Sequence, residues 1–185
     1  MRNAIIGSIV TLALLAICGF AVAALGGMPT NADATPPRIE INLATGALDA
    51  AINRHAPRAK NPIEVNDQNV IDGMKIYTMN CATCHGALDK TESPLAHSFY
   101  PPAPQLILHP VDDPQWHVFY AIKNGIRYTG MPSWKNALSE ADMWKVTAFV
   151  SSIESLSPGV RLYWSNSFGV DPSAQSSAKA NNGHE

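Results

Sequence analysis

The most strongly hydrophobic segment of the chain lies close to its N-terminus. Residues 4–25 follow Arg2 and form an uncharged, mostly apolar run of 22 residues. This run exceeds the roughly 7–15 residues of a cleaved signal core and reaches the roughly 20 residues that a membrane-spanning helix requires. We therefore expect an uncleaved anchor within residues 1–27. Because the positive charge precedes the run, the rest of the chain is predicted on the outer, periplasmic side of the cytoplasmic membrane.

The same segment also carries a possible processing signal. Ala21-Val22-Ala23 fits a small-x-small cleavage site, and cleavage there would release a soluble periplasmic protein. The pattern leaves both outcomes open, although the length of the run favours the anchor.

Periodic apolar positions predict a first helix that runs into Cys81. Val70, Met74 and Tyr77 follow one another at the i, i+4 and i+7 spacing, and Asp67 precedes them as a candidate N-cap. Residues 28–66, before this helix, mix Pro, Ala, Asn and balanced charge. They predict a spacer with one weak helical stretch over residues 47–55.

Two further helices follow a proline-rich loop over residues 90–110. Asp113-Pro114 supplies a start signal and Asn124-Gly125 a stop, which predicts a helix over residues 114–124. Ser139 begins a capping box with Asp142, and an apolar face then continues to a predicted end near Ser157-Pro158-Gly159. The domain is thus expected over residues 67–158, followed by a largely disordered extension over residues 159–185.

Composition and charge narrow the function. The 185 residues carry a formal net charge of −2, and residues 67–158 hold nine Asp and Glu against six Lys and Arg. The Lys and Arg residues are not clustered along the sequence, which argues against a nucleic-acid partner. The odd count of three cysteines, with Cys18 inside the apolar run, argues against a disulfide framework.

The other two cysteines belong to the motif that carries the chemistry. Cys81-Ala82-Thr83-Cys84-His85 has the C-x-x-C-H form of a haem-attachment site. Two thiols at this spacing on a helical turn face the same way and can form thioethers with one edge of a porphyrin, while His85 reaches the iron. A thioredoxin-like dithiol would need a β-strand before the C-x-x-C motif, and the sequence predicts none there. A zinc site is also disfavoured, because a Cys followed directly by a ligand His fits tetrahedral coordination poorly.

A sixth iron ligand must come from elsewhere in the chain, and Met131 is the candidate. It lies in Gly130-Met131-Pro132, where glycine permits a close approach and proline stiffens the backbone. Met74, Met79 and Met143 fall on helical stripes and are instead interpreted as core methionines. His97, His109 and His117 remain the alternative ligands.

These motifs resemble the class I cytochrome c family over residues 67–157. The resemblance rests on Cys81–His85, on Gly130–Pro132, on Gly73 with Tyr77, and on Trp144–Phe149. It implies an all-α cytochrome c fold, with three to five short helices wrapped around one covalently attached haem c with its iron. The first and last helices would cross at Gly73 and pack Tyr77 against Phe149. The carbonyl of Pro104 would accept a hydrogen bond from His85, and Trp116, Arg127 and Trp134 would lie near the haem propionates or simply be exposed.

The resemblance implies a one-electron carrier of a bacterial-type respiratory or dehydrogenase-linked chain, not an enzyme. Iron bound by both His85 and Met131 would have no open position for a substrate. The expected partners are membrane or periplasmic redox proteins, together with membrane lipid around the N-terminal helix. Two alternatives stay open: a haem c subunit of a membrane-bound oxidoreductase complex, and a peroxidase-like enzyme in which Met131 leaves the iron.

Overall fold

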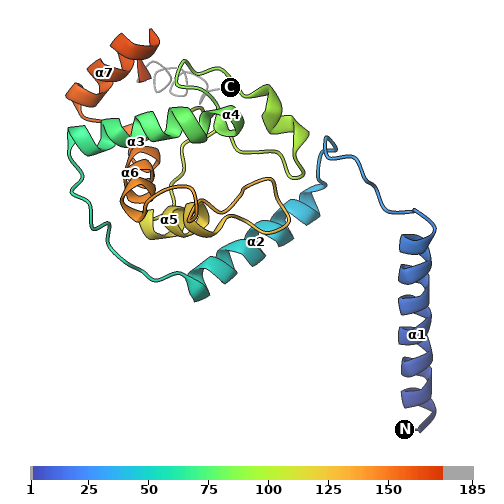
Figure 1. Ribbon diagram of the computed structural model, residues 1–185. Helices are drawn as coiled ribbons and strands as arrows, with labels where there is room; N and C mark the ends of the chain where they lie inside the picture. The colour runs from blue at the N-terminus through green and yellow to red at the C-terminus, as the bar shows by residue number, and fades with distance from the viewer. Residues whose placement is uncertain (1, 173–185) are drawn as a thin grey trace, which may run out of the picture. The chain divides into compact units, whose positions relative to one another are not determined.

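The computed structural model describes residues 2–172, and all the regular structure within them is helical (Figure 1). The chain divides into two compact units between Ala32 and Asp33. The first unit contains α1 (Arg2–Ala24). The second contains α2 (Arg38–His55), α3 (Asp67–Asn80), α4 (Ala82–His85), α5 (Gln115–Asn124), α6 (Glu140–Val150) and α7 (Pro158–Phe168), with short 3₁₀ helices η1 (Pro94–Ser98) and η2 (Ile153–Ser155). The predicted all-α fold class is confirmed.

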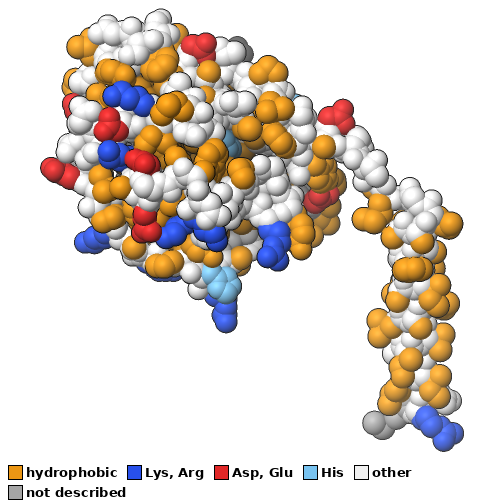
Figure 2. Space-filling model, viewed as in Figure 1, with side chains coloured by type: hydrophobic (Ala, Val, Ile, Leu, Met, Phe, Trp, Pro, Cys, Tyr) orange, Lys and Arg blue, Asp and Glu red, His pale blue; other side chains and the backbone are white. Residues whose placement is uncertain are grey.

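Helix α1 is the predicted apolar N-terminal helix. Its most apolar 18-residue stretch has a mean hydropathy of 2.6, and its side chains are almost all exposed, as the orange surface of this helix in Figure 2 shows. It is long enough and apolar enough to cross a membrane, but a signal sequence would meet the same criteria.

The second unit is built on the crossing of α3 and α6. At Gly73 the two backbones come so close that a Cβ atom would lie 2.1 Å from the carbonyl oxygen of Lys145. The fully buried rings of Tyr77 and Phe149 pack edge to face beside this contact, with centroids 5.5 Å apart. Glycine is thus the residue that allows this crossing, because any side chain would push the helices apart.

The helix starts agree only partly with the sequence prediction. Asn66, not Asp67, caps α3 by accepting a hydrogen bond from the backbone N–H of Asn69. Pro114 is the N-cap residue of α5, whereas Asp113 makes no cap and lies 3.6 Å from the ring of His117. The predicted Ser139 cap of α6 is confirmed, because its hydroxyl accepts from the N–H of Asp142 at 3.1 Å. The second half of the predicted capping box differs, because the Asp142 carboxylate accepts from the Ser139 hydroxyl at 2.7 Å.

Helix α7 overturns the prediction of a largely disordered extension from residue 159. The Ser157-Pro158-Gly159 sequence was expected to end a helix, but α6 ends at Val150 and Ser157 caps a new one with Pro158 in its first turn. Trp164 on α7 is fully buried, and its indole N–H donates to the carbonyl of Leu88 at 2.8 Å. The last part of the predicted extension, residues 173–185, lies outside the described residues.

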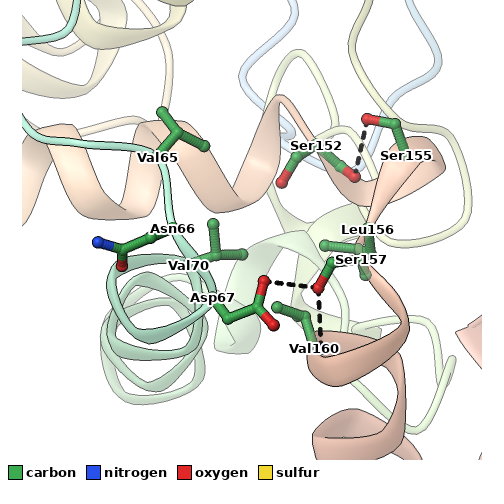
Figure 3. A pocket seen from close by; sticks show the side chains of 9 residues that line it. All are labelled: Val65, Asn66, Asp67, Val70, Ser152, Ser155, Leu156, Ser157 and Val160. Atoms are coloured by element: carbon green, nitrogen blue, oxygen red, sulfur yellow. Dashed lines mark hydrogen bonds between the residues drawn. The ribbon is translucent and has the colours of Figure 1, made fainter.

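The N-termini of α3 and α7 meet at a small pocket, drawn in Figure 3. There the Ser157 hydroxyl donates to the carboxylate of Asp67 at 2.6 Å and also accepts from the N–H of Val160. A Cβ on Gly159 would lie 2.4 Å from the Asp67 carboxylate, so this glycine leaves room for it. Asp67 therefore joins two helix N-termini, where negative charge is favourable.

Residues 28–66 are more than the spacer that their composition predicted. Helix α2 spans 18 residues, about twice the predicted weak helix, and packs against α5 with Ile52 buried. Beyond it, the Asn61 side-chain amide donates to Gln115 and to the carbonyl of Trp144. The sequence shows little helical periodicity in apolar residues over α2, because most side chains of this helix are exposed and only a narrow stripe is buried.

Candidate haem site

The two cysteines of the attachment motif lie on one turn at the C-terminal end of α3. Cys81 ends α3, and its carbonyl accepts hydrogen bonds from the N–H groups of Cys84 at 3.1 Å and His85 at 2.9 Å. Both are free thiols and partly exposed. Burial, with a smaller contribution from Cys84, raises the pKa of Cys81 to about 12, so its thiol is protonated at neutral pH. The turn thus presents two free thiols from one short segment.

His85 is held in the tautomer that suits a metal ligand. Its Nδ1 lies 2.8 Å from the carbonyl oxygen of Pro104, which can only accept, so Nδ1 carries the proton and Nε2 keeps its lone pair. Burial lowers the pKa of His85, while the Pro104 contact opposes that shift. The backbone carbonyl of His85 accepts from the Tyr77 hydroxyl and from the N–H of Leu106, both at 2.9 Å.

The loop that carries Pro104 is braced by a side chain that the sequence analysis missed. Gln105 is buried; its side-chain oxygen accepts from the N–H of Ser93 at 2.7 Å and its nitrogen donates to the carbonyl of Cys84 at 3.0 Å. Ser93 in turn donates through its hydroxyl to the carbonyl of Thr83. The sequence gives only a weak indication of this role, because Gln105 is simply a long polar residue directly after Pro104.

Met131 lies on a loop that folds back onto α5. The N–H of Ile126 donates to the carbonyl of Met131, and the N–H of Trp134 donates to the carbonyl of Ile122, at 3.1 and 3.2 Å. Gly130 lies against Phe99, where a Cβ would come within 2.4 Å of the ring. Met131 itself is half-buried. The Met131 loop is therefore fixed on one side to α5 and on the other to the loop after the attachment motif.

The remaining candidates are distributed around this site. The Trp116 ring lies 5.4 Å from the guanidinium of Arg58, and His117 is buried, with side-chain carboxylates of Asp49 and Asp113 at 3.8 and 3.6 Å. His97, His109 and Arg127 are exposed, and Trp134 is half-buried.

Met79, which was expected in the core, is 71 % exposed, so that prediction is wrong. Met79 lies nine residues after Val70, about half a turn away around the helix axis, so it faces away from the buried side of α3.

The residues fit a covalently bound haem. They offer two thiols on one turn, an imidazole with its Nε2 lone pair retained, and a thioether on a constrained loop. Several apolar residues packed on the core are only half-buried, which suits a flat apolar cofactor: Leu106, Val111, Val118 and Ile122. Within residues 2–172, no group of three His, Cys, Asp or Glu side chains could hold a metal ion.

A comparison with protein families agrees with this chemistry. Residues 68–150 match the family described as cytochrome c oxidase, cbb3-type, subunit III. No curated protein and no solved structure matches the chain. The match spans α3 to α6 and leaves α1, α2 and α7 outside. The predicted haem c cofactor and its electron-transfer role are confirmed at the level of this domain: residues 68–150 are a c-type cytochrome domain, which implies covalently bound haem c with its iron and is consistent with the class I monohaem cytochromes c.

Proposed function

We propose that this protein carries one electron at a time through a haem held by thioethers to Cys81 and Cys84, with His85 and Met131 as the axial ligands. The single observation that supports this most strongly is the 2.8 Å contact from His85 Nδ1 to Pro104, beside the two free thiols. It fixes the ring orientation and leaves Nε2 as the only ring nitrogen that can bind iron.

The haem supplies a reversible one-electron iron couple when it is bound. The chain's own residues set the conditions for that couple. Pro104 orients His85 and strengthens its basicity, and the loop from Ile126 to Trp134 limits how far the Met131 sulfur can move. A soft thioether would favour the reduced iron, and iron bound by both His85 and Met131 would have no position left for a substrate.

The assignment of Met131 is tested by Met131→Ala in the holoprotein, with Met79→Ala as the matched control. Met79 is also a methionine of this domain but is 71 % exposed. We expect Met131→Ala to retain covalent haem, to lose the weak far-red sulfur-to-iron absorption band of the ferric protein, and to have a lower potential. Met79→Ala should keep the band. Survival of the band in Met131→Ala would refute the assignment.

Carbon monoxide distinguishes the two ways in which the variant could respond. If the sixth position opens, the reduced variant should bind carbon monoxide readily. If His97, His109 or His117 replaces the thioether, the band is lost but the iron stays closed to the gas. His117 is the least available of the three, because it is buried beside Asp49 and Asp113.

We further propose that α1 anchors the haem domain to the outer face of the cytoplasmic membrane. The support is a 23-residue helix whose most apolar 18-residue stretch has a mean hydropathy of 2.6, with the positive charge of Arg2 at its N-terminal end. The domain would then comprise residues 67–158 together with α7. The intact protein should sediment with membranes, and its N-terminus should retain residues 1–25 in mass spectrometry. A mature N-terminus near Ala24 would instead establish a soluble periplasmic protein.

A second candidate is a haem c subunit of a membrane-bound oxidoreductase complex. It is favoured by one observation, the match to a family described as an oxidase subunit. The electron chemistry would be the same, but the donor and acceptor would belong to the same assembly. Solubilisation in mild detergent followed by native electrophoresis with haem staining decides between them: a free carrier migrates alone, and a subunit migrates with a larger complex.

A further inference from the structure

Helix α2 contacts the domain near both of its ends. Towards its C-terminus Ile52 is buried at 3 % exposure, and the carboxylate of Asp49 lies 3.8 Å from Nε2 of His117 on α5. Towards its N-terminus the Glu40 carboxylate interacts with the Tyr100 hydroxyl, and this interaction raises the pKa of Tyr100. Figure 1 shows the corresponding arrangement, with one end of α2 beside the loop that follows η1 and the other beside α5.

The two contacts fall on opposite sides of the candidate haem site. Tyr100 belongs to the loop that leads to Pro104, the residue that orients His85. His117 belongs to α5, onto which the Met131 loop folds through the Ile126–Met131 and Trp134–Ile122 hydrogen bonds. Helix α2 therefore ties the His85 side of the site to the Met131 side, although it lies outside the residues that match the cytochrome family.

The two sides also touch directly, one residue away from the Tyr100 contact. Phe99 packs on Gly130 so closely that a Cβ on this glycine would overlap the ring. Gly130 is the neighbour of Met131, so a shift of Phe99 and Tyr100 away from the Met131 loop would free the backbone next to the thioether. A helix fixed to Tyr100 and to α5 opposes such a separation.

We propose that α2 is a brace that keeps the Met131 thioether on the haem iron, with Ile52, Asp49 and Glu40 as its positioning residues. The proposal rests on Met131 ligation as proposed above. Loosening α2 lets the loop of Tyr100 and α5 move apart, and the Met131 loop opens more often without unfolding of the α3–α6 crossing. Local opening of this kind has its own free energy, smaller than that of global unfolding.

The test is the rate at which imidazole replaces Met131 in the ferric, full-length holoprotein in detergent, followed by loss of the far-red band. Ile52→Ala removes the buried contact of α2, and Ile39→Ala is the matched control, because Ile39 is on the same helix but 70 % exposed. We expect Ile52→Ala to accelerate replacement about tenfold and Ile39→Ala to leave it within about twofold. The melting temperature is measured alongside as a readout of global stability.

Tyr100→Phe serves as the second variant because it removes only the hydroxyl that binds Glu40 and preserves the ring. It should accelerate replacement about twofold to threefold with an unchanged melting temperature. The brace is refuted if Ile52→Ala lowers the melting temperature while imidazole replaces Met131 at the rate seen in Ile39→Ala, or if Tyr100→Phe has no effect on that rate. A wild-type ferric protein that lacks the band would refute Met131 ligation itself, and the brace with it.

Discussion

The two sides of the haem domain differ in how completely the protein fills them. Where α3, α6 and α7 meet, Tyr77, Phe149 and Trp164 are fully buried and their rings pack against one another with centroids 5.5 to 5.8 Å apart. On the other side, Cys81, Cys84, His85 and Met131 are all partly exposed, and the apolar residues around them are half-buried. One side is a finished protein core, whereas the other exposes apolar surface that a bound cofactor would cover.

This difference indicates how stability and function are divided. The packed side needs only the chain's own residues, because the rings and aliphatic side chains reach the density of a protein interior. The apolar residues on the open side become buried only when haem is attached. A domain of this size buries little apolar surface otherwise, so it depends on this contribution for its stability. Folding and haem binding are therefore expected to be coupled.

The largest effect is expected from the double variant Cys81→Ala/Cys84→Ala, which removes both thioether bonds. Covalent haem should be absent and most of the cooperative fold lost, because the open side then lacks its cofactor. Haem staining on a denaturing gel and circular dichroism measure the two consequences. Cys18→Ala on α1 is the control and should stain like the wild type. A stained band from the double variant would contradict the attachment site.

The packed side is probed by Gly73→Ala, with Gly46→Ala as the control. A Cβ at Gly73 would lie 2.1 Å from the backbone oxygen of Lys145, whereas a Cβ at Gly46 on α2 meets nothing within 4 Å. Gly73→Ala should lower the free energy of unfolding by about 3 kcal/mol or more, since backbone atoms cannot yield like a flexible side chain. Gly46→Ala should change it by less than about 1 kcal/mol. Thermal unfolding of both holoproteins checks this, and similar losses would disprove the close crossing.

A smaller loss is expected at the contact that docks α7. Trp164→Phe removes the hydrogen bond to the carbonyl of Leu88 and leaves a small cavity beside Phe149. The expected destabilisation is about 2 kcal/mol. Leu162→Ala on the same helix is the control, because Leu162 is 63 % exposed, and it should cost less than about 0.5 kcal/mol. If chemical denaturation shows no loss for Trp164→Phe, α7 does not belong to the packed side.

The smallest effect concerns the ion pair at the edge of the α3–α6 crossing. Asp72 lies 3.2 Å from the Lys145 ammonium, and this hydrogen bond is the main cause that lowers the pKa of Asp72. A lowered pKa stabilises the folded state above the ordinary carboxyl range, and the contribution is lost progressively as the pH falls from about 4 through the lowered pKa. Asp72→Asn should cost about 0.5 kcal/mol at pH 7 and less at pH 3. An equal loss at both pH values would show that charge is not the cause.

Several local features could be predicted because they depend on neighbours in the chain. The stripe of Val70, Met74 and Tyr77 is buried as its spacing indicated, and Ser139 caps α6. The Met79 prediction failed because Met79 lies about half a turn around α3 from Val70 and therefore outside the buried stripe. Ser157-Pro158 is interpreted from the sequence as the end of a helix. Ser is equally suited to be an N-cap, and Pro to be the first residue of a helix. The pair begins α7 here because this helix buries Trp164 in the core.

The sequence by itself predicted the attachment motif, because two thiols and a histidine within five residues share one turn in any helical context. It also determined the apolar N-terminal helix, whose character depends on composition alone. Only the tertiary structure decided that Gln105 braces the loop of Pro104, that Phe99 packs on Gly130, and that α2 spans from Tyr100 to His117. These contacts join residues that are far apart in the chain. They form only when whole helices and loops pack together, so the local spacing of residues cannot predict them.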